Sequence, residues 1–419
     1  MRDAFRFSLE DFFFSDSESI TEPPSDFDAW VESPETQACF SFFEQPFLAG
    51  PDASTVVRSN LDDQRRTVIN LTSYNYLGLS THPEVLQAAR EALDRYGLGA
   101  AGAPVLSGTY DLHQEFARRL ADFKGYEDCV LFSGGAAANY GAIQGLLRRG
   151  DQLVLDQRAH QSLIDGGNMA KARLHFFEHN NPESLAKTLE KVKGKRCLVA
   201  VEGVYSMDGD LGDLPPLLDV CDAAGVPMYV DEAHSAFLFG ETGRGVAEHF
   251  GVDDRIPITF GTMSKVLGGV GGFVCADRRL TRYLKAYSTP WIFSCACSPP
   301  VVAGCMKALE IASSSDTLRQ RLWHNVDRFR SQLSSLGLNL GDSASQIIPI
   351  IIGSSASDLF GLAGELQRRG LFLQPVDFPA VPADSRRFRL SVSAQLTDAQ
   401  IDEACNIIES VIPARLRVA

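Results

Sequence analysis

The segment best suited to chemistry is Thr262-Met263-Ser264-Lys265, which runs directly into the glycine-rich residues 266–272. It follows residues 256–260, an apolar β-branched run that predicts a buried strand. Hydroxyl groups can hydrogen-bond an anion, glycines allow close approach of the backbone, and a desolvated lysine amine can form a Schiff base. Taken alone, the segment is explained equally well by an ordinary turn that carries a surface lysine.

Other reactive groups also follow predicted strands. Ser133-Gly134-Gly135 precedes a predicted helix, and the free N–H groups and dipole of a helix N-terminus favour an anion. Asp231 ends a buried strand, where a carboxylate is costly unless it is paired. His160 and His234 follow two more strand ends. Each piece alone has an ordinary explanation, as turn chemistry or a structural histidine.

Together these groups match the needs of pyridoxal 5'-phosphate. The helix N-terminus and the hydroxyls would hold its phosphate, and a buried carboxylate would keep its ring nitrogen protonated. The lysine would hold its aldehyde. The order and spacing of the pieces therefore predict a site for this cofactor, with no metal.

Two other motifs are excluded by their context. Residues 97–102 read G-x-G-x-x-G, but they follow a predicted helix, whereas a dinucleotide-binding fingerprint follows a strand and opens a helix. Residues 231–234 read D-E-A-H, but the chain has no G-x-x-x-x-G-K-[ST] phosphate loop, so a helicase is rejected.

The predicted elements alternate between short apolar strands and helices from about residue 129 to residue 276. This pattern predicts an α/β fold with a mostly parallel central sheet covered by helices on both faces. Ligands of such sheets bind beyond the carboxyl ends of the strands. We expect an N-terminal arm over residues 1–66, a large cofactor-binding domain over 67–297 and a smaller α+β domain over 298–419, with regular structure beginning near Val68.

Composition narrows the class of protein further. With 45% hydrophobic and 22% charged residues the chain is typical of a globular protein, and its net charge of −14 argues against a nucleic-acid partner. No apolar run approaches the roughly 18 residues of a membrane helix, and no secretory signal is evident. Nine scattered cysteines predict reduced thiols and a cytoplasmic location. The first 40 residues are acidic and contain Phe12-Phe13-Phe14, which suggests a flexible arm that docks in part.

The chain resembles the α-oxoamine synthases, a family of fold-type I pyridoxal-phosphate enzymes, over roughly residues 41–413. The motifs that carry the resemblance are Asn75-Tyr76-Leu77-Gly78-Leu79, Ser107-Gly108-Thr109, Phe132-Ser133-Gly134, Asp156 with residues 160–166, residues 202–210, Asp231-Glu232-Ala233-His234-Ser235, Thr262-Met263-Ser264-Lys265 and Arg389-Leu390-Ser391. The resemblance implies a decarboxylative Claisen condensation of glycine, alanine or serine with an acyl thioester, giving an α-amino ketone. It also implies a homodimer.

The resemblance assigns a role to each matching residue. Lys265 would hold the cofactor and act as acid and base, Asp231 would pair with the ring nitrogen, His160 would stack on the ring, and His234 would hydrogen-bond its phenolic oxygen. The remaining assignments are Ser206 near that same edge, Ser133, Gly134, Gly135, Thr262 and Ser264 around the phosphate, and Asn75 and Arg389 on the carboxylate of the amino acid.

Two departures concern the substrates. Members that use acyl-CoA often carry an arginine where this chain has Pro104, and many carry a histidine where it has Leu396. The acyl donor could therefore be bound to an acyl carrier protein rather than to coenzyme A. Alternatives are a non-decarboxylating 2-amino-3-ketobutyrate CoA ligase type, an aminotransferase, and a catalytically silent partner subunit.

Overall fold

A computed structural model describes residues 19–42, 44–378 and 380–417. Phe12-Phe13-Phe14, predicted to lie in a docking arm, falls outside them. The chain forms two compact units, one comprising Met1–Ser73 with Leu322–Ala419 and the other comprising Tyr74–Arg321. The sequence predicts a different division, into three parts with boundaries near residues 67 and 298. That division stays a prediction.

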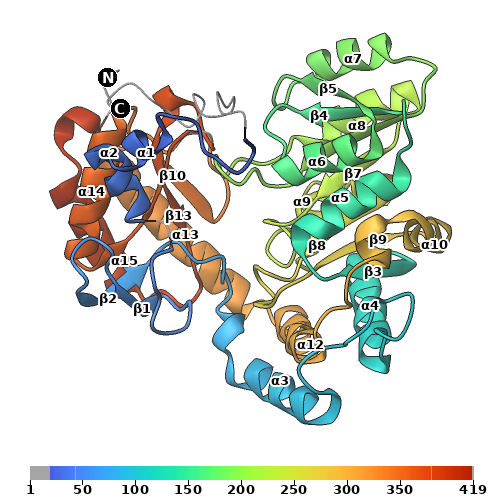
Figure 1. The fold of residues 1–419 in the computed structure, drawn as a ribbon, viewed down its shortest axis with the longest axis horizontal. Coiled ribbons are helices and arrows are strands. Elements are labelled where there is room, and N and C mark those ends of the chain that lie inside the picture. Colours follow the sequence, from blue (N-terminus) through green and yellow to red (C-terminus); the bar gives the residue numbers. More distant parts are fainter. Residues whose placement is uncertain (1–18, 43, 379, 418–419) are drawn as a thin grey trace. The chain divides into compact units, whose positions relative to one another are not determined.

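The second unit is built on a seven-stranded sheet with the order β3-β9-β8-β7-β6-β4-β5 (Figure 1). Only β9 runs antiparallel to its neighbours, which confirms the predicted mostly parallel sheet. The strands are β3 (Asp128–Phe132), β4 (Gln152–Asp156), β5 (Arg173–Phe177), β6 (Cys197–Glu202), β7 (Met228–Asp231), β8 (Ile258–Thr262) and β9 (Gly272–Ala276).

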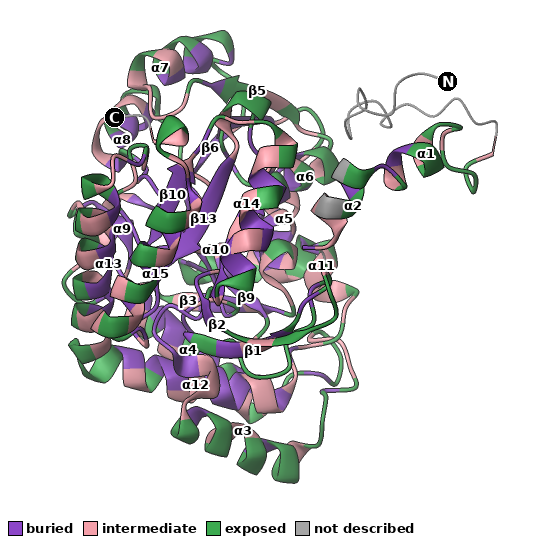
Figure 2. Cartoon of the chain, turned by 90° about the vertical axis from the view of Figure 1, so that its left-hand side faces the viewer, coloured by how far each residue is buried: buried purple, intermediate pink, exposed green. Residues whose placement is uncertain are grey.

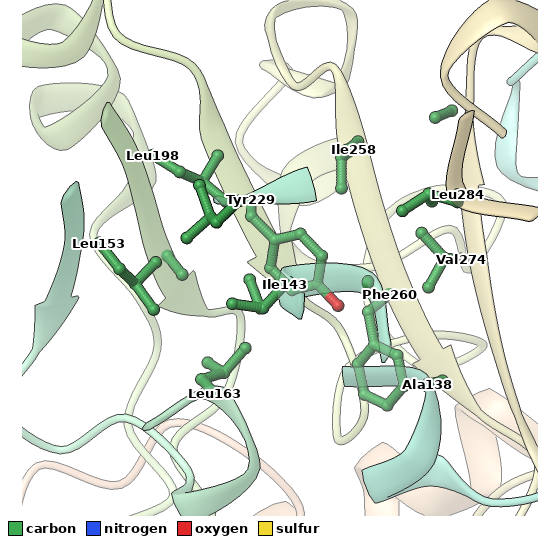
Figure 3. Close-up of a cluster of buried hydrophobic side chains, with 14 of the residues drawn as sticks. Ala138, Ile143, Leu153, Leu163, Leu198, Tyr229, Ile258, Phe260, Val274 and Leu284 are labelled. Carbon is green, nitrogen blue, oxygen red and sulfur yellow. The ribbon is translucent and has the colours of Figure 1, made fainter. Parts of the chain in front are cut away.

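Helices cover this sheet on both faces. Apolar residues of α5 and α6 pack with alternate strand residues in one buried cluster, which Figure 3 shows around Tyr229, Ile143 and Phe260. The intervening strand residues Val199 and Val230 are also fully buried, as expected for a parallel sheet. The helices of the unit are α3 (Pro83–Tyr96), α4 (Asp111–Lys124), α5 (Gly135–Leu146), α6 (Gln161–Ala170), α7 (Pro182–Lys191), α8 (Leu214–Ala224), α9 (Val246–His249), α10 (Arg278–Tyr287), α11 (Thr289–Ile292) and α12 (Pro299–Ser314).

The first unit holds two three-stranded sheets, with the orders β1-β2-β11 and β10-β13-β12. Figure 2 shows β10 and β13 as buried strands. The strands are β1 (Ser54–Arg58), β2 (Arg65–Asn70), β10 (Ile347–Ile351), β11 (Leu371–Phe372), β12 (Gln374–Val376) and β13 (Arg387–Ser391). The helices are α1 (Phe27–Val31), α2 (Pro34–Phe40), α14 (Ala356–Arg368) and α15 (Asp398–Val411), and α13 (Thr317–Ser335) begins in the other unit.

Two features differ from the expectations for these elements. Regular structure is predicted to begin near Val68, but within the described residues it begins with α1 at Phe27, and β1 begins at Ser54, because residues 54–58 pair with β2 in an antiparallel hairpin. The sequence also did not predict β5, an edge strand with only Phe177 buried. No helix within the described residues is long and apolar enough to cross a bilayer.

Candidate active site

The carboxyl edge of the large sheet gathers most of the predicted site residues. Strands β3, β4, β6, β7 and β8 run in the same direction, so all five end at this edge. The residues that follow or end these strands are Ser133 after β3, His160 after β4, Ser206 after β6, Asp231 at the end of β7, and Thr262 with Lys265 at the end of β8. The topology of the sheet alone therefore brings residues from five separate segments to the same carboxyl edge.

The N-terminus of α5 lies against the end of β8. Gly134 is the N-cap residue of this helix, and no side chain caps it. A Cβ atom on Gly135 would lie 2.8 Å from the Thr262 hydroxyl oxygen, so that hydroxyl contacts the first turn of the helix. The Thr262 Oγ1 atom in turn lies 2.8 Å from the Ser264 Oγ atom. Uncapped N–H groups and two hydroxyls together form a cradle suited to a phosphate.

Strand β9 keeps this cradle compact. A Cβ atom on Gly272, the first residue of β9, would lie 2.7 Å from the Ala138 Cβ atom and 2.9 Å from the Gly135 Cα atom. Glycine at residue 272 therefore lets the first turn of α5 approach the sheet more closely than any other residue would. Ser133 is exposed beside the cradle, with its hydroxyl 3.4 Å from that of Ser294.

Two buried carboxyl groups lie side by side on neighbouring strands. Glu202 and Asp231 are paired residues of β6 and β7, and both side chains are almost inaccessible. Burial and the nearby charge of Asp231 raise the pKa of Glu202 well above its usual range. Burial also raises the pKa of Asp231, but a hydrogen bond from Asn139 and the charge of Lys265 oppose this rise. We infer that Glu202 holds the proton of the pair and that Asp231 is the carboxylate.

A chain of hydrogen bonds connects Asp231 to His160. Asn139 donates its Nδ2 to Asp231 over 2.6 Å and to the Ser162 hydroxyl over 3.0 Å, and the Tyr229 hydroxyl donates to its Oδ1 atom over 2.6 Å. The Ser162 hydroxyl lies 2.7 Å from His160 Nδ1. Asn139 is thus oriented by Tyr229 from the core side, and it fixes the carboxylate and, through Ser162, the imidazole.

His160 is also held through its backbone, whose N–H donates to the Glu202 carboxyl over 2.6 Å. Its side chain is exposed at the sheet edge. A planar ring that is fixed at one nitrogen and exposed on its face can stack on an aromatic ligand.

Lys265 lies among aromatic side chains. Its Nζ atom is 5.8 Å from the centre of the Tyr74 ring, and that ring packs edge-on against His234 at 5.9 Å. His234 is buried, and its Nδ1 atom lies 2.9 Å from the Tyr76 hydroxyl. The structure therefore brings Lys265 and His234 together through Tyr74, and Tyr76 fixes the orientation of the imidazole.

The other predicted residues are placed as follows. Ser206 lies in the loop after β6, which is closed by the bridge between Val204 and Leu211. Asn75 is buried in the second unit, and its Oδ1 atom accepts the Ser80 N–H over 3.1 Å. Arg389 is buried in β13 and belongs to the first unit.

Sequence reasoning missed four contributors to this site, namely Asn139, Ser162, Glu202 and Tyr76. Ser162, Glu202 and Tyr76 lie in the motifs that carry the family resemblance, but their hydrogen-bonding partners could not be identified from these motifs. Asn139 lies in the middle of an Ala-rich helix, where an amide side chain is poorly favoured. A polar side chain at this place in the helix was the one feature of the sequence that could have indicated a role for Asn139.

The sheet and the groups at its carboxyl edge define an α/β enzyme. A family model described as aminotransferase class I and II matches residues 66–408. The 8-amino-7-oxononanoate synthase of Thermoanaerobacter pseudethanolicus is 38% identical over 356 residues, which cover 84% of this chain and 89% of that protein.

Solved structures agree with this match. The Sphingomonas wittichii serine palmitoyltransferase superposes with a TM-score of 0.86 at 32% identity, covering 92% of this chain and 97% of that one. A structure of a serine palmitoyltransferase with PLP as an internal aldimine gives 0.84 at 32% identity, covering 88% and 92%. The chain belongs to the aminotransferase class I and II family and, within it, to the α-oxoamine synthases.

Proposed function

We propose that this protein is a pyridoxal-phosphate-dependent acyltransferase that condenses a small amino acid with an acyl thioester. Carbon dioxide is lost in the reaction, and the product is an α-amino ketone. The observation that carries the proposal is the arrangement of an amine, Lys265, and a buried carboxylate, Asp231, beside an uncapped helix N-terminus at one sheet edge. The relatives named above support the same reaction type.

The residues present fit pyridoxal 5'-phosphate. The N-terminus of α5 with the hydroxyls of Thr262 and Ser264 forms a cradle for its phosphate. The absence of a side chain at Gly135 keeps this cradle open, because a Cβ atom there would intrude on the Thr262 hydroxyl. Asp231 is a buried carboxylate that the ring nitrogen would complement, since it receives hydrogen bonds from Asn139 and from the Ala233 N–H. When bound, the cofactor supplies an electron sink that stabilises negative charge on the α-carbon of an amino acid.

The chain's own groups then have distinct tasks. Lys265 Nζ holds the cofactor covalently between turnovers, takes the α-proton of the amino acid and later returns a proton. His160 would pack against the cofactor ring, and His234, whose Nδ1 atom lies 2.9 Å from the Tyr76 hydroxyl, would hydrogen-bond the phenolic oxygen. Ser206 would lie near that same edge of the cofactor. Asn75 and Arg389 bind the carboxylate of the amino acid, a task suited to the guanidinium fork.

The reaction is tested by adding glycine, alanine and serine one at a time to the cofactor-loaded protein. One of them should exchange its α-proton with solvent and change the absorbance of the cofactor. Adding an acyl thioester to that amino acid should then release CO₂ and form the α-amino ketone. Turnover with a 2-oxo acid and without a thioester would instead identify an aminotransferase, and condensation without release of CO₂ would identify the ligase type.

Replacing Gly135 with alanine tests the phosphate cradle. The new Cβ atom would lie 2.8 Å from Thr262 Oγ1, so the hydroxyl or the helix must shift. We expect the dissociation constant for pyridoxal phosphate to rise on the order of tenfold. Equilibrium titration by absorbance measures it. The control is Gly361→Ala in α14, where a Cβ atom meets no neighbour within 4 Å; equal affinities in the two variants would contradict the cradle.

We further propose that the protein is a homodimer, on the evidence of an exposed apolar surface. Leu98, Leu106 and Phe293 are 81%, 82% and 80% exposed. The segments that carry them are joined, because the Ala296 N–H donates to the Gly102 carbonyl over 2.9 Å. Large apolar side chains that gather on a surface commonly mark a protein interface.

The dimer is tested with Phe293→Asp, which places a charge on this surface. We expect the mass measured by light scattering to fall from two chains towards one, with the far-UV circular dichroism unchanged. The control is Tyr287→Asp, also in an exposed aromatic residue of the same unit. A wild-type protein that is monomeric at micromolar concentration would refute the dimer outright.

The acyl donor is the least defined substrate, and we propose that it is carried by an acyl carrier protein. Pro104 lines a cavity of about 440 Å³ that also borders His113 and Ser133. Among the described residues that line it, Lys285 is the one lysine or arginine, and it is paired with Asp128 at 3.2 Å. The cavity thus offers little attraction to the phosphates of coenzyme A.

Turnover should be compared with the same acyl group on carrier protein and on coenzyme A. We expect the wild type to prefer the carrier-bound donor. We expect Pro104→Arg to raise kcat/KM for the CoA thioester by about tenfold. One partly exposed ion pair between an arginine and a phosphate contributes roughly this factor. Equal use of both donors by the wild type would overturn this part of the proposal.

A cytoplasmic location is supported by the state of the cysteines. All nine thiols are free, and six of them are buried. Burial raises the pKa of Cys221 to about 12, which keeps this thiol protonated and unreactive. Free thiols of this kind persist in reducing compartments. Labelling of intact cells with a membrane-impermeant thiol reagent should leave the exposed Cys295 unmodified.

A further inference from the structure

A histidine that the reaction does not use lies between two carboxylates near the sheet edge. His179 follows β5, and its Nδ1 atom is 2.9 Å from Asp156 Oδ1 while its Nε2 atom is 2.6 Å from Asp210 Oδ2. Its side chain is 12% exposed, and those of Asp156 and Asp210 are 0% and 11% exposed. The three groups form a charged cluster that is largely shielded from solvent.

The geometry fixes the protonation of this imidazole. A carboxylate only accepts hydrogen bonds, so both ring nitrogens must carry a proton to satisfy both contacts. The Asn180 amide nitrogen lies 3.3 Å from Nε2, but its better partner is the Leu211 carbonyl at 2.8 Å. Burial opposes the charge on His179, yet the hydrogen bonds to Asp156 and Asp210 outweigh it and raise the pKa of His179 to about 9.

The two carboxylates belong to two segments that carry predicted cofactor contacts. Asp156 accepts the Arg158 N–H over 2.8 Å, and its own carbonyl accepts the Ala159 N–H, so it shapes the turn that ends in His160. Asp210 lies in the loop of residues 203–212, where its carbonyl accepts the Tyr205 N–H over 3.0 Å. That loop carries Ser206. His179 is therefore a direct connection between the turn of residues 156–160 and the loop of residues 203–212.

Other groups face this connection. The Tyr205 ring packs edge-on against the imidazole at 4.5 Å. Arg158 and Asp208 form a second ion pair between the same two segments at 3.4 Å, but it is more exposed, with 45% and 23% of the side chains accessible. A half-exposed pair contributes little, because solvent screens it. The buried cluster is thus the stronger of the two side-chain connections.

We propose that His179 is a positioning residue for the cofactor site: its doubly protonated ring joins the turn that carries His160 to the loop that carries Ser206 and so sets the position of both side chains. The inference rests on the proposed function, which gives those two residues their task. His179 itself touches neither substrate nor cofactor.

The first test measures hydrogen exchange of the protein without cofactor. In His179→Gln, exchange should rise on the order of tenfold in residues 156–160 and 203–212, because two buried carboxylates lose their shared cation. Asp210→Asn should loosen residues 203–212 and leave 156–160 closer to the wild type. The matched control is His175→Gln in β5, where the imidazole lies 2.9 Å from the Gln152 side-chain oxygen; neither segment should change there.

The second test uses pH. Because the pKa of His179 is raised from its ordinary 6.5 to about 9, its stabilising effect is complete below pH 6.5 and is lost as the pH rises through 9. Protection of the two segments in the wild type should therefore fall near pH 9, beyond the ordinary base-catalysed increase measured in β7. This step should be absent in His179→Gln. Should that variant fail to fold, the wild-type step and Asp210→Asn still decide the question.

The third test connects the segments to the cofactor. In His179→Gln the dissociation constant for pyridoxal phosphate should rise on the order of tenfold, as expected when two contacts are misplaced. Unchanged exchange in both segments would overturn the inference, and so would faster exchange with unchanged cofactor affinity. A wild type that binds no pyridoxal phosphate would refute the proposed function instead, and the exchange data would still report on the connection.

Discussion

Lys265→Ala should abolish turnover and the visible absorbance of the cofactor-loaded protein together. In the proposed function, Lys265 would be the amine that holds the cofactor covalently and also the base for the α-proton of the amino acid. Loss of both tasks predicts a fall in kcat of about 10⁴-fold or more. Absorbance spectra after reconstitution, and α-proton exchange of the amino acid, measure the two effects separately.

The control for this variant is Lys187→Ala, in an exposed residue of α7 in the same unit. It should keep both the absorbance and the rate of the wild type. A Lys265→Ala protein that retains α-proton exchange would show that another base acts in this site. A wild type that takes up no cofactor would instead support the catalytically silent subunit.

Asp231→Asn should leave the protein folded but strongly impaired. The amide keeps the size of the carboxylate, and one oxygen can still accept from Asn139 or from the Ala233 N–H, so the local hydrogen bonds are largely preserved. In the proposed function, the substitution would remove the charge that keeps the ring nitrogen of the cofactor protonated. We expect kcat to fall by about 10²–10³-fold, the usual value of one preorganised electrostatic contact.

The same variant has a diagnostic pH dependence. Burial raises the pKa of Asp231, so protonation at acidic pH would remove the carboxylate that we propose pairs with the ring nitrogen of the cofactor. The affinity of the wild type for pyridoxal phosphate should therefore fall as the pH is lowered through that pKa. In Asp231→Asn the affinity should be lower and should lack this dependence. An Asp231→Asn variant with wild-type affinity and pH dependence would contradict the assignment, and Glu202 would then be the group to test.

The fold of the second unit was largely predictable because its strands are continuous apolar runs that end in polar groups. The positions of Asp231, Lys265 and Thr262 at strand ends followed from the same pattern, since parallel strands share an edge. Edge strand β5 was not predictable, because four of its five residues are not buried and its pattern is mixed. Strand β1 has alternating burial, but regular structure was expected to begin only near Val68, so its hairpin with β2 was not recognised.

The contacts within the site could not be predicted from the sequence, for a different reason. Glu202 and Asp231 become neighbours only because β6 lies beside β7, and strand order cannot be read from spacing along the chain. Asn139 reaches Asp231 from a helix, across the face of the sheet. The role proposed for His179 depends on Asp156 and Asp210, which belong to two segments that contact it from either side. In each case the missing information was which element packs against which.

Tyr229 belongs to two parts of the protein at once. Its ring packs in the apolar cluster shown in Figure 3, and its hydroxyl donates to Asn139, which in turn donates to Asp231. A mutation that repacks the core around this ring can therefore be neutral for folding and still be removed by selection on catalytic rate. Tyr229→Phe should therefore keep the packing of the core and lose the hydrogen bond to Asn139, whereas a volume-conserving apolar substitution at Ile143 changes packing alone.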